Sequence, residues 1–332
     1  MAARGRAPFL RPLAARTLRA AKTVEHWLVG QLAFAILWFL RLLPPARALG
    51  FADRAARRIG PWVGRHRVAM DNLRRAYPEK TEDELQAIAS DMWGNMARLA
   101  GEYLYLDRLF DIHPRDGEPA RVEIVGEEIF LRLREDKRPH IFFTAHTGNF
   151  ELLPVAAAAY GLQVTALFRA PNNPYIAKYI FSTRAEAMGE LIASRAGAAF
   201  GLARVLERGG NIGVLVDQKF RRGVPTTFFG RPCNTSPLVA KLARQYDCDV
   251  HPARSIRLPG NRFRLEVYDR LELPRTPTGA VDVAATSQLL NDVVEGWVRE
   301  HPGQWMWFHK RWQLDGKPAR KPAAESPAGP QS

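Results

Sequence analysis

The chain has 332 residues, of which 46% are hydrophobic, and it carries a formal net charge of +14 with a pI near 10.2. This length and apolar content exclude general disorder and allow one large core or two small ones. The excess of basic residues indicates an anionic partner, which could be nucleic acid, an acidic protein or an anionic membrane. Only two cysteines are present, Cys233 and Cys248. They form neither a disulfide framework nor a metal-knuckle spacing, so we expect reduced thiols in the cytosol.

The N-terminal segment divides into a basic leader, residues 1–22, and an apolar stretch, residues 23–45. The leader contains no acidic residue, and Trp27 to Leu40 contains no charge at all. No small-residue cleavage site follows, which disfavours a secretory signal peptide. A full span needs about 20 apolar residues, so the stretch could either cross a bilayer or lie in its interface. A buried core helix is the remaining alternative. We expect a membrane anchor helix at 23–45.

Residues 65–106 have a helical pattern. Thr81 followed by Glu84 predicts a capping box at a helix start. Beyond it, apolar residues recur at helical spacing, which is most simply explained by core packing, with an acyl-chain groove as the less favoured reading. These residues are Leu85, Ile88, Met92, Met96 and Leu99.

Strand and helix patterns alternate from there to residue 300. We expect strands at 141–143, 164–168, 211–216, 250–256 and 262–268, and helices at 150–159, 175–188, 200–208, 236–245 and 281–300. This rhythm predicts an α/β fold in which helices flank a mainly parallel central sheet. The C-terminal residues from 317 onward are rich in Pro, Ala and Ser, which predicts disorder.

Three polar residues, His146, Arg169 and Asp217, follow the ends of three of these expected strands. Binding and catalytic sites of open parallel sheets form at that edge. Arg169 stands directly after an apolar strand and before the turn APNNP, which makes it a candidate ligand for an anion.

His146 and Glu151 form the most suggestive pair. On one continuous helix they would lie roughly 140° apart and could not meet. If His146 lies in a loop and Glu151 in the first turn of a helix that Asn149 caps, the carboxylate can fold back onto the imidazole. His146 would then act as a general base, and Glu151 would fix its tautomer and stabilise the imidazolium. A histidine with a purely structural role is the alternative.

Several other chemistries lack their motifs. The chain contains no G-x-S-x-G, no H-E-x-x-H, no cysteine–histidine cluster and no P-loop, so we expect no metal and no cofactor. The segment QWMWFHKRW, residues 304–312, could stack on nucleic-acid bases. A membrane-facing rim or packing beside a site is the favoured explanation, and we expect no nucleic-acid partner.

Five ordered motifs, HTGNFE, FRAPNNP, VDQ, FFG and QWMWFHKRW, carry a family resemblance. Together they resemble the lysophospholipid acyltransferase superfamily, and more narrowly the lauroyl/myristoyl acyltransferases of lipid A biosynthesis in Gram-negative bacteria. The resemblance covers residues 25 to 313. It implies a glycerol-3-phosphate acyltransferase-like domain at 46–315, followed by a disordered tail at 316–332.

The resemblance also implies an activity. A fatty acyl group would pass from acyl carrier protein to a hydroxyl of a lipid A precursor, at the cytoplasmic face of the anionic inner membrane, in the late acylations of lipopolysaccharide biosynthesis. Acylation of glycerol phosphate or a lysophospholipid is the alternative within the same chemistry. A basic membrane- or nucleic-acid-binding protein without catalysis is the alternative from another class.

Residue roles follow from the matched motifs. His146 would be the base and Glu151 its partner, and Asp217 and Gln218 match the acid and amide of a D-Q pair. Arg184 matches an arginine of the family, although its spacing to the next glycine is one residue longer than usual. We expect the substrate to be bound by Asn149, Arg169, Arg184, Asp217 and Gln218, with the arginines contacting phosphates.

Overall fold

A seven-stranded sheet organises the chain in the computed structural model, which describes residues 10–103, 105, 120–168, 171, 173–187, 190–194 and 197–312. The strand order is β1-β9-β8-β2-β5-β3-β4, and every neighbouring pair is parallel except β8 with β9. The prediction of a mainly parallel sheet is therefore confirmed. The strands are β1 (Val122–Val125), β2 (His140–Thr144), β3 (Val164–Phe168), β4 (Leu191–Ala193), β5 (Asn211–Leu215), β8 (Asp249–Leu258) and β9 (Arg262–Val267).

The centre of the sheet is buried on both faces, as expected for parallel strands covered by helices. Along β2, Ile141 and Phe143 join one apolar core, while Phe142 joins a second core on the opposite face. The first core is completed by α3 (Gly64–Ala76), α4 (Glu82–Glu102), α9 (Ala198–Glu207), α10 (Leu238–Tyr246) and α11 (Val283–Glu300). The second core is completed by α6 (Glu127–Glu135) and α7 (Leu152–Ala159).

Some elements were not predicted from the sequence. Strands β1 and β4 are short and only partly buried, so they lack a clear period-2 pattern. A separate antiparallel hairpin, β6 (Val224–Phe228) and β7 (Arg231–Thr235), packs against α11. Helix α2 (Pro45–Ile59) and the 3₁₀ turns η1 (Gly60–Trp62) and η2 (Pro302–Gln304) were not predicted either.

The capping box that begins α4 is confirmed. The Thr81 hydroxyl accepts the Glu84 N–H at 3.3 Å, and Glu84 Oε2 accepts the Thr81 N–H at 2.8 Å. Within the stripe that follows, Leu85, Met92 and Leu99 are buried. The stripe is thus core packing.

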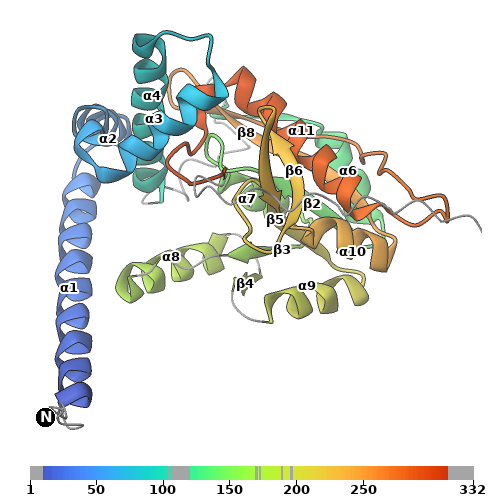
Figure 1. The fold of residues 1–332 in the computed structure, drawn as a ribbon, viewed down its shortest axis with the longest axis horizontal. Coiled ribbons are helices and arrows are strands. Elements are labelled where there is room, and N and C mark those ends of the chain that lie inside the picture. Colours follow the sequence, from blue (N-terminus) through green and yellow to red (C-terminus); the bar gives the residue numbers. More distant parts are fainter. Residues whose placement is uncertain are drawn as a thin grey trace, which may run out of the picture.

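The N-terminal helix α1 (Leu10–Arg41) projects from the body as one long helix (Figure 1). It begins inside the expected leader and runs without a break to Arg41, where the chain turns into α2 at Pro45. Residues 20–41 form a helix of 22 residues with mean hydropathy 1.3, of which only 11% is buried. By length and composition it can cross a membrane. The buried-core alternative is wrong, because Leu32 and Trp38 are more than half exposed.

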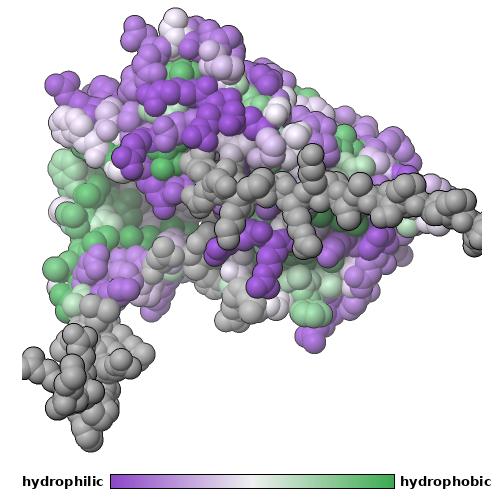
Figure 2. Space-filling view, in the orientation of Figure 1, coloured by the Kyte–Doolittle hydropathy of each residue, from purple (hydrophilic) through white to green (hydrophobic). Residues whose placement is uncertain are grey.

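Helix α1 lies against α8 (Pro174–Ala187), which extends from the sheet towards it (Figure 1). Asn173 Nδ2 donates to the His26 carbonyl at 2.6 Å, and the rings of Phe34 and Tyr179 meet edge to face at 5.8 Å. Figure 2 shows apolar side chains along α1 that continue to where α8 meets it. These contacts place the exposed apolar helix α1 beside α8.

Candidate active site

His146 and Asp217 meet at the carboxyl edge of the sheet. Each follows the end of its strand by two residues, and β2 and β5 are parallel neighbours in which Thr144 pairs with Leu215. Adjacent parallel strands end at the same edge of the sheet, so the residues that follow them lie side by side. Nδ1 of His146 consequently lies 2.8 Å from Oδ1 of Asp217, and the His146 backbone N–H donates to Oδ2 at 3.0 Å.

The Asp217 carboxylate is enclosed and ionised. Trp305 Nε1 donates to Oδ2 at 2.8 Å, and Asp217 is only 4% exposed. Burial alone would raise the pKa of Asp217, but the facing charge of His146 and the hydrogen bonds from His146 and Trp305 lower it below its ordinary value. The site therefore keeps a negative charge on the Nδ1 side of the imidazole.

The other ring nitrogen of His146 faces Gln218. When the imidazole carries its proton on Nδ1, this N–H donates to Asp217 and Nε2 is unprotonated. The lone pair of Nε2 then accepts a hydrogen bond from the Gln218 amide at 3.1 Å. The same amide nitrogen lies 3.4 Å from Nε2 of His309. The Phe150 ring meets the imidazole edge to face at 4.9 Å. A hydroxyl that displaced the Gln218 amide would meet a general base.

The C-terminal aromatic segment packs behind this pair. Trp305, Trp307 and Trp312 are each at most 2% exposed, and their indole N–H groups donate to Asp217, to the Pro302 carbonyl and to the Phe228 carbonyl. Buried rings cannot stack on bases. The expected packing beside a site is confirmed.

The loop after β2 is fixed at Gly148. Its φ is +56°, and a Cβ there would come within 2.2 Å of the Ser255 carbonyl oxygen, so a side chain is excluded. The Gly148 N–H donates to the Gln304 carbonyl at 3.1 Å, and the Thr147 N–H donates to the Ala145 carbonyl at 2.8 Å. Two N–H groups of this loop, those of Thr147 and Gly148, thus already have partners within the protein.

Asn149 also positions this loop. Its Nδ2 donates to Glu102 Oε2 at 2.8 Å, and Arg257 Nη2 donates to the same oxygen at 2.9 Å. The expectation that Asn149 is the N-cap is wrong, because α7 begins at Leu152 with Glu151 as its N-cap; Asn149 Oδ1 instead accepts the Glu151 N–H at 3.2 Å. Since Asn149 is 1% exposed, it orients the loop from behind.

Glu151 lies in the turn before α7 with its side chain buried. The sequence assigns the tautomer of His146 to Glu151, whereas in the structure the Asp217 carboxylate lies 2.8 Å from Nδ1 of this imidazole. Asp217 could be assigned only to substrate binding from the sequence. The strand order, which puts β5 beside β2, is what brings it to His146.

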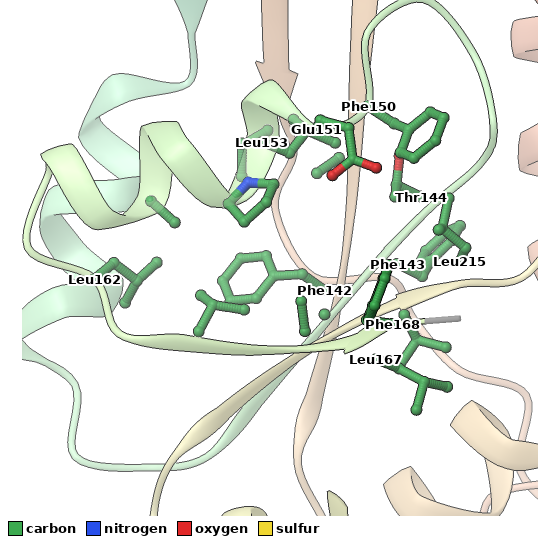
Figure 3. Close-up of a pocket in the computed structure, with 18 of the residues that line it drawn as sticks. Phe142, Phe143, Thr144, Phe150, Glu151, Leu153, Leu162, Leu167, Phe168 and Leu215 are labelled. Atoms are coloured by element: carbon green, nitrogen blue, oxygen red, sulfur yellow. The ribbon is translucent and has the colours of Figure 1, made fainter. Parts of the chain in front are cut away.

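An apolar cavity of about 90 Å³ opens beside the site, between α7 and the sheet (Figure 3). Phe150, Glu151 and Thr144 form one end, and Leu162 lies towards the other. Small residues leave room along it, namely Ala157, Ala166 and Gly213. The cavity is thus lined mainly by apolar side chains, and the carboxylate of Glu151 lies at one end of it.

Two expected ligands are not described at side-chain level. Arg169 lies outside the described residues. Arg184 lies in helix α8, and the structure describes its backbone only. The tail at 316–332 is likewise outside the described residues. Cys233 and Cys248 are free thiols, as the composition predicted, and both are buried.

Comparison with known proteins gives one consistent result. The family model described as bacterial lipid A biosynthesis acyltransferase matches residues 15–314. "Lipid A biosynthesis acyltransferase 2" of Shigella flexneri is 25% identical over 82% of this chain and 85% of its own. "Lipid A biosynthesis myristoyltransferase" of Escherichia coli (strain K12) is 24% identical over 84% of this chain and 85% of its own. With its matching motifs in order and nine-tenths of its length covered, the chain belongs to the bacterial lipid A biosynthesis acyltransferase family.

Proposed function

We propose that this protein transfers a fatty acyl group from acyl carrier protein to a hydroxyl of a lipid A precursor, with His146 as general base. The observation that carries the proposal is the His146–Asp217 pair beside an apolar cavity. The pair supplies a base and the cavity supplies a site for a hydrocarbon chain. Acyl transfer uses both, whereas a protein that only binds lipid has no use for the base.

In the proposed reaction, Nε2 of His146 removes the proton of the acceptor hydroxyl as its oxygen attacks the thioester carbon. The tetrahedral intermediate collapses, the carbon–sulfur bond breaks, and the carrier thiolate leaves and receives the proton from His146. General base catalysis of this kind supplies about 10²- to 10⁴-fold, roughly 3–5 kcal/mol of the barrier. Asp217 orients the ring and stabilises the imidazolium.

Glu151 is proposed as the second carboxylate of the site. It lines the cavity end next to Phe150, which contacts the imidazole. A negative charge there favours the imidazolium as it forms. The oxyanion is proposed to receive its hydrogen bonds from the Asn149 N–H or from Arg184, because the Thr147 and Gly148 N–H groups are already engaged.

We propose that α1 anchors the enzyme in the inner membrane with the site on the cytoplasmic face. On α2 and η1, the exposed apolar residues Phe51, Ile59 and Trp62 accompany arginines, a composition suited to an anionic interface. Because α8 contacts the middle of α1, the helix that contains Arg184 lies near the same lipid surface. The remaining basic surface would guide an acidic carrier protein by electrostatic steering.

The test is acyl transfer by purified full-length protein in detergent. Acyl carrier protein loaded with lauroyl or myristoyl groups is mixed with a lipid A precursor or, separately, with lysophosphatidic acid. We expect release of free carrier thiol and a mass increase of the lipid A precursor alone. Thiol release only with lysophosphatidic acid would contradict the acceptor, and none with either would contradict the activity. Mass spectrometry of lipid A from a strain lacking the protein would then identify the chain and its position.

A further inference from the structure

A second cluster of chemically capable side chains lies at the opposite end of the sheet from His146. His140 begins β2 and pairs with Asp249, which begins β8, and Phe142 pairs with His251. One donor atom from each of His140, Asp249 and His251 lies within 4.8 Å of the other two. The cluster shares no residue with the acyl-transfer site.

The two imidazoles are buried and lack the hydrogen bonds that buried polar groups normally make. His140 is fully buried and His251 is 2% exposed. Both ring nitrogens of His140 and Nε2 of His251 have no hydrogen-bond partner among the described residues. Their rings meet edge to face at 5.3 Å. Such nitrogens are costly to bury unless something binds them.

The hydrogen bond that His251 does make prepares it as a ligand. Its Nδ1 lies 3.1 Å from the Tyr268 carbonyl oxygen, which accepts only a proton-bearing nitrogen. Nε2 is then left with a free lone pair in a ring of fixed orientation. Metal-binding histidines are usually held in this manner, by a second-shell carbonyl or carboxylate on the other nitrogen.

Two carboxylates adjoin the rings. Asp249 is partly exposed, so an ion can reach the cluster from solvent. Asp249 Oδ2 lies 3.4 Å from Nη2 of Arg138, and Oδ1 lies 3.3 Å from Nη1 of Arg270. A carboxylate oxygen has more than one lone pair, so it can contact an arginine and a metal together. Asp136, the C-cap of α6, has Oδ2 3.5 Å from Nε2 of His140, without hydrogen-bond geometry.

Burial lowers the pKa of both His140 and His251. For His140, the charges of Asp136 and Asp249 raise the pKa and so oppose the effect of burial. The charges of Arg138 and Arg132 lower it further.

We propose that His140, His251 and Asp249 bind a divalent transition-metal ion, Zn²⁺ in the first instance, with Asp136 in reach as a fourth ligand. Two imidazoles and carboxylate oxygen suit zinc better than calcium or magnesium. Donors about 2.0–2.1 Å from a tetrahedral zinc lie roughly 3.3 Å apart, so small side-chain rotations close the site. The ion would join β2, β8 and the end of α6, a structural role remote from catalysis.

The experiment measures zinc on full-length protein purified without a histidine tag. The protein is stripped with chelator, freed of it, incubated with Zn²⁺ and gel-filtered, and bound metal is measured by atomic emission. We expect about one zinc ion per chain and a rise in the unfolding temperature of several degrees, because only the folded chain presents the site.

Asp249→Asn is the principal variant, since it keeps the shape of a partly exposed side chain. We expect its zinc affinity to fall at least about 10-fold. His251→Phe, whose ring can stack on Phe142 as the imidazole does, should bind no zinc at this site. His66→Gln is the matched control, because His66 accepts a hydrogen bond from Nε1 of Trp93 and is not part of the cluster, and it should bind zinc as wild type does.

Wild-type protein without stoichiometric zinc would overturn the proposal. So would unchanged affinity in Asp249→Asn and His251→Phe, which would place the zinc elsewhere. Circular dichroism shows whether His251→Phe folds, and if it does not, Asp249→Asn alone decides. Acyl transfer is not needed for any of these outcomes, so the metal site is tested independently of the proposed function.

Discussion

A single carboxylate, that of Asp217, accepts both the backbone N–H and the ring Nδ1–H of His146. One side chain thereby fixes the exit of β2 and the tautomer of the imidazole together. Trp305 donates to the same carboxylate and closes it from solvent. The imidazole is therefore held in one orientation by the protein itself.

Replacing His146 with Ala should reduce acyl transfer by about 10²- to 10⁴-fold, because Nε2 is the proposed proton acceptor. The carrier-thiol release assay measures this directly. Membrane sedimentation and circular dichroism should remain as in wild type, because α1 and the core are untouched. Near-wild-type turnover in a folded variant would remove His146 from the mechanism.

Asp217→Asn should lower kcat by a similar factor, since the amide cannot stabilise an imidazolium or hold the same tautomer. Steady-state kinetics with a fixed lipid acceptor distinguish this from a binding defect, which would raise KM instead. Trp305→Phe removes only one donor to Asp217 and should have a smaller effect. A larger loss in Trp305→Phe than in Asp217→Asn would contradict this assignment.

Asp217→Asn should also change how the stability of the protein depends on pH in the acid range. The folded pKa of Asp217 is lowered, so its stabilisation is fully present above the unfolded value of about 3.9 and is lost as pH falls towards the folded value. Wild-type urea midpoints should therefore fall more steeply than those of Asp217→Asn between about pH 5 and about pH 3. Parallel pH profiles for the two proteins would contradict the lowered pKa.

Glu151→Gln should also reduce turnover, because a neutral amide in the cavity wall does not offset the charge that forms on His146. Glu127→Gln, on the exposed start of α6, is the control and should behave as wild type. The two variants are compared by kcat at equal donor concentration. Unchanged kcat in Glu151→Gln would leave Asp217 as the carboxylate partner of the base.

Filling the cavity should change chain-length selection. Ala157 lines it six residues beyond Glu151, whereas the neighbouring Ala158 is exposed. Ala157→Leu should shift the kcat/KM ratio towards shorter acyl donors, and Ala158→Leu should leave the ratio unchanged. Overpacking costs about 1–3 kcal/mol, so thermal unfolding of both variants is measured alongside. An unchanged ratio in Ala157→Leu would mean that the acyl chain binds elsewhere.

Arg257→Met should destabilise the protein by about 3–5 kcal/mol, because Glu102 is fully buried and would lose its charge partner. Urea unfolding measures the difference. Arg74→Met, which breaks an exposed pair with Glu82, should cost only about 0–1 kcal/mol. A comparable cost for the two variants would show that the buried pair is not what fixes the Asn149 loop.

The sequence by itself determined most of the sheet strands, several of the helices around them and the choice of His146 as a candidate site residue. The central strand His140–Thr144, which is buried on both faces, appears in the sequence as an apolar run that the structure reproduces. The Thr81 capping box and the apolar N-terminal helix depend on residues close in the chain, which is why local patterns are sufficient for them. His146 was identifiable because its motif is contiguous.

Tertiary structure alone decided which residues meet His146. Asp217 is 71 residues away and reaches it only because β5 is placed beside β2, a choice of strand order that no local pattern specifies. The buried Trp305 and the His140–His251 contact likewise depend on long-range packing. Side-chain partners across a sheet are set by the free energy of the whole packed core, whereas helices and strands are set largely by the residues they contain.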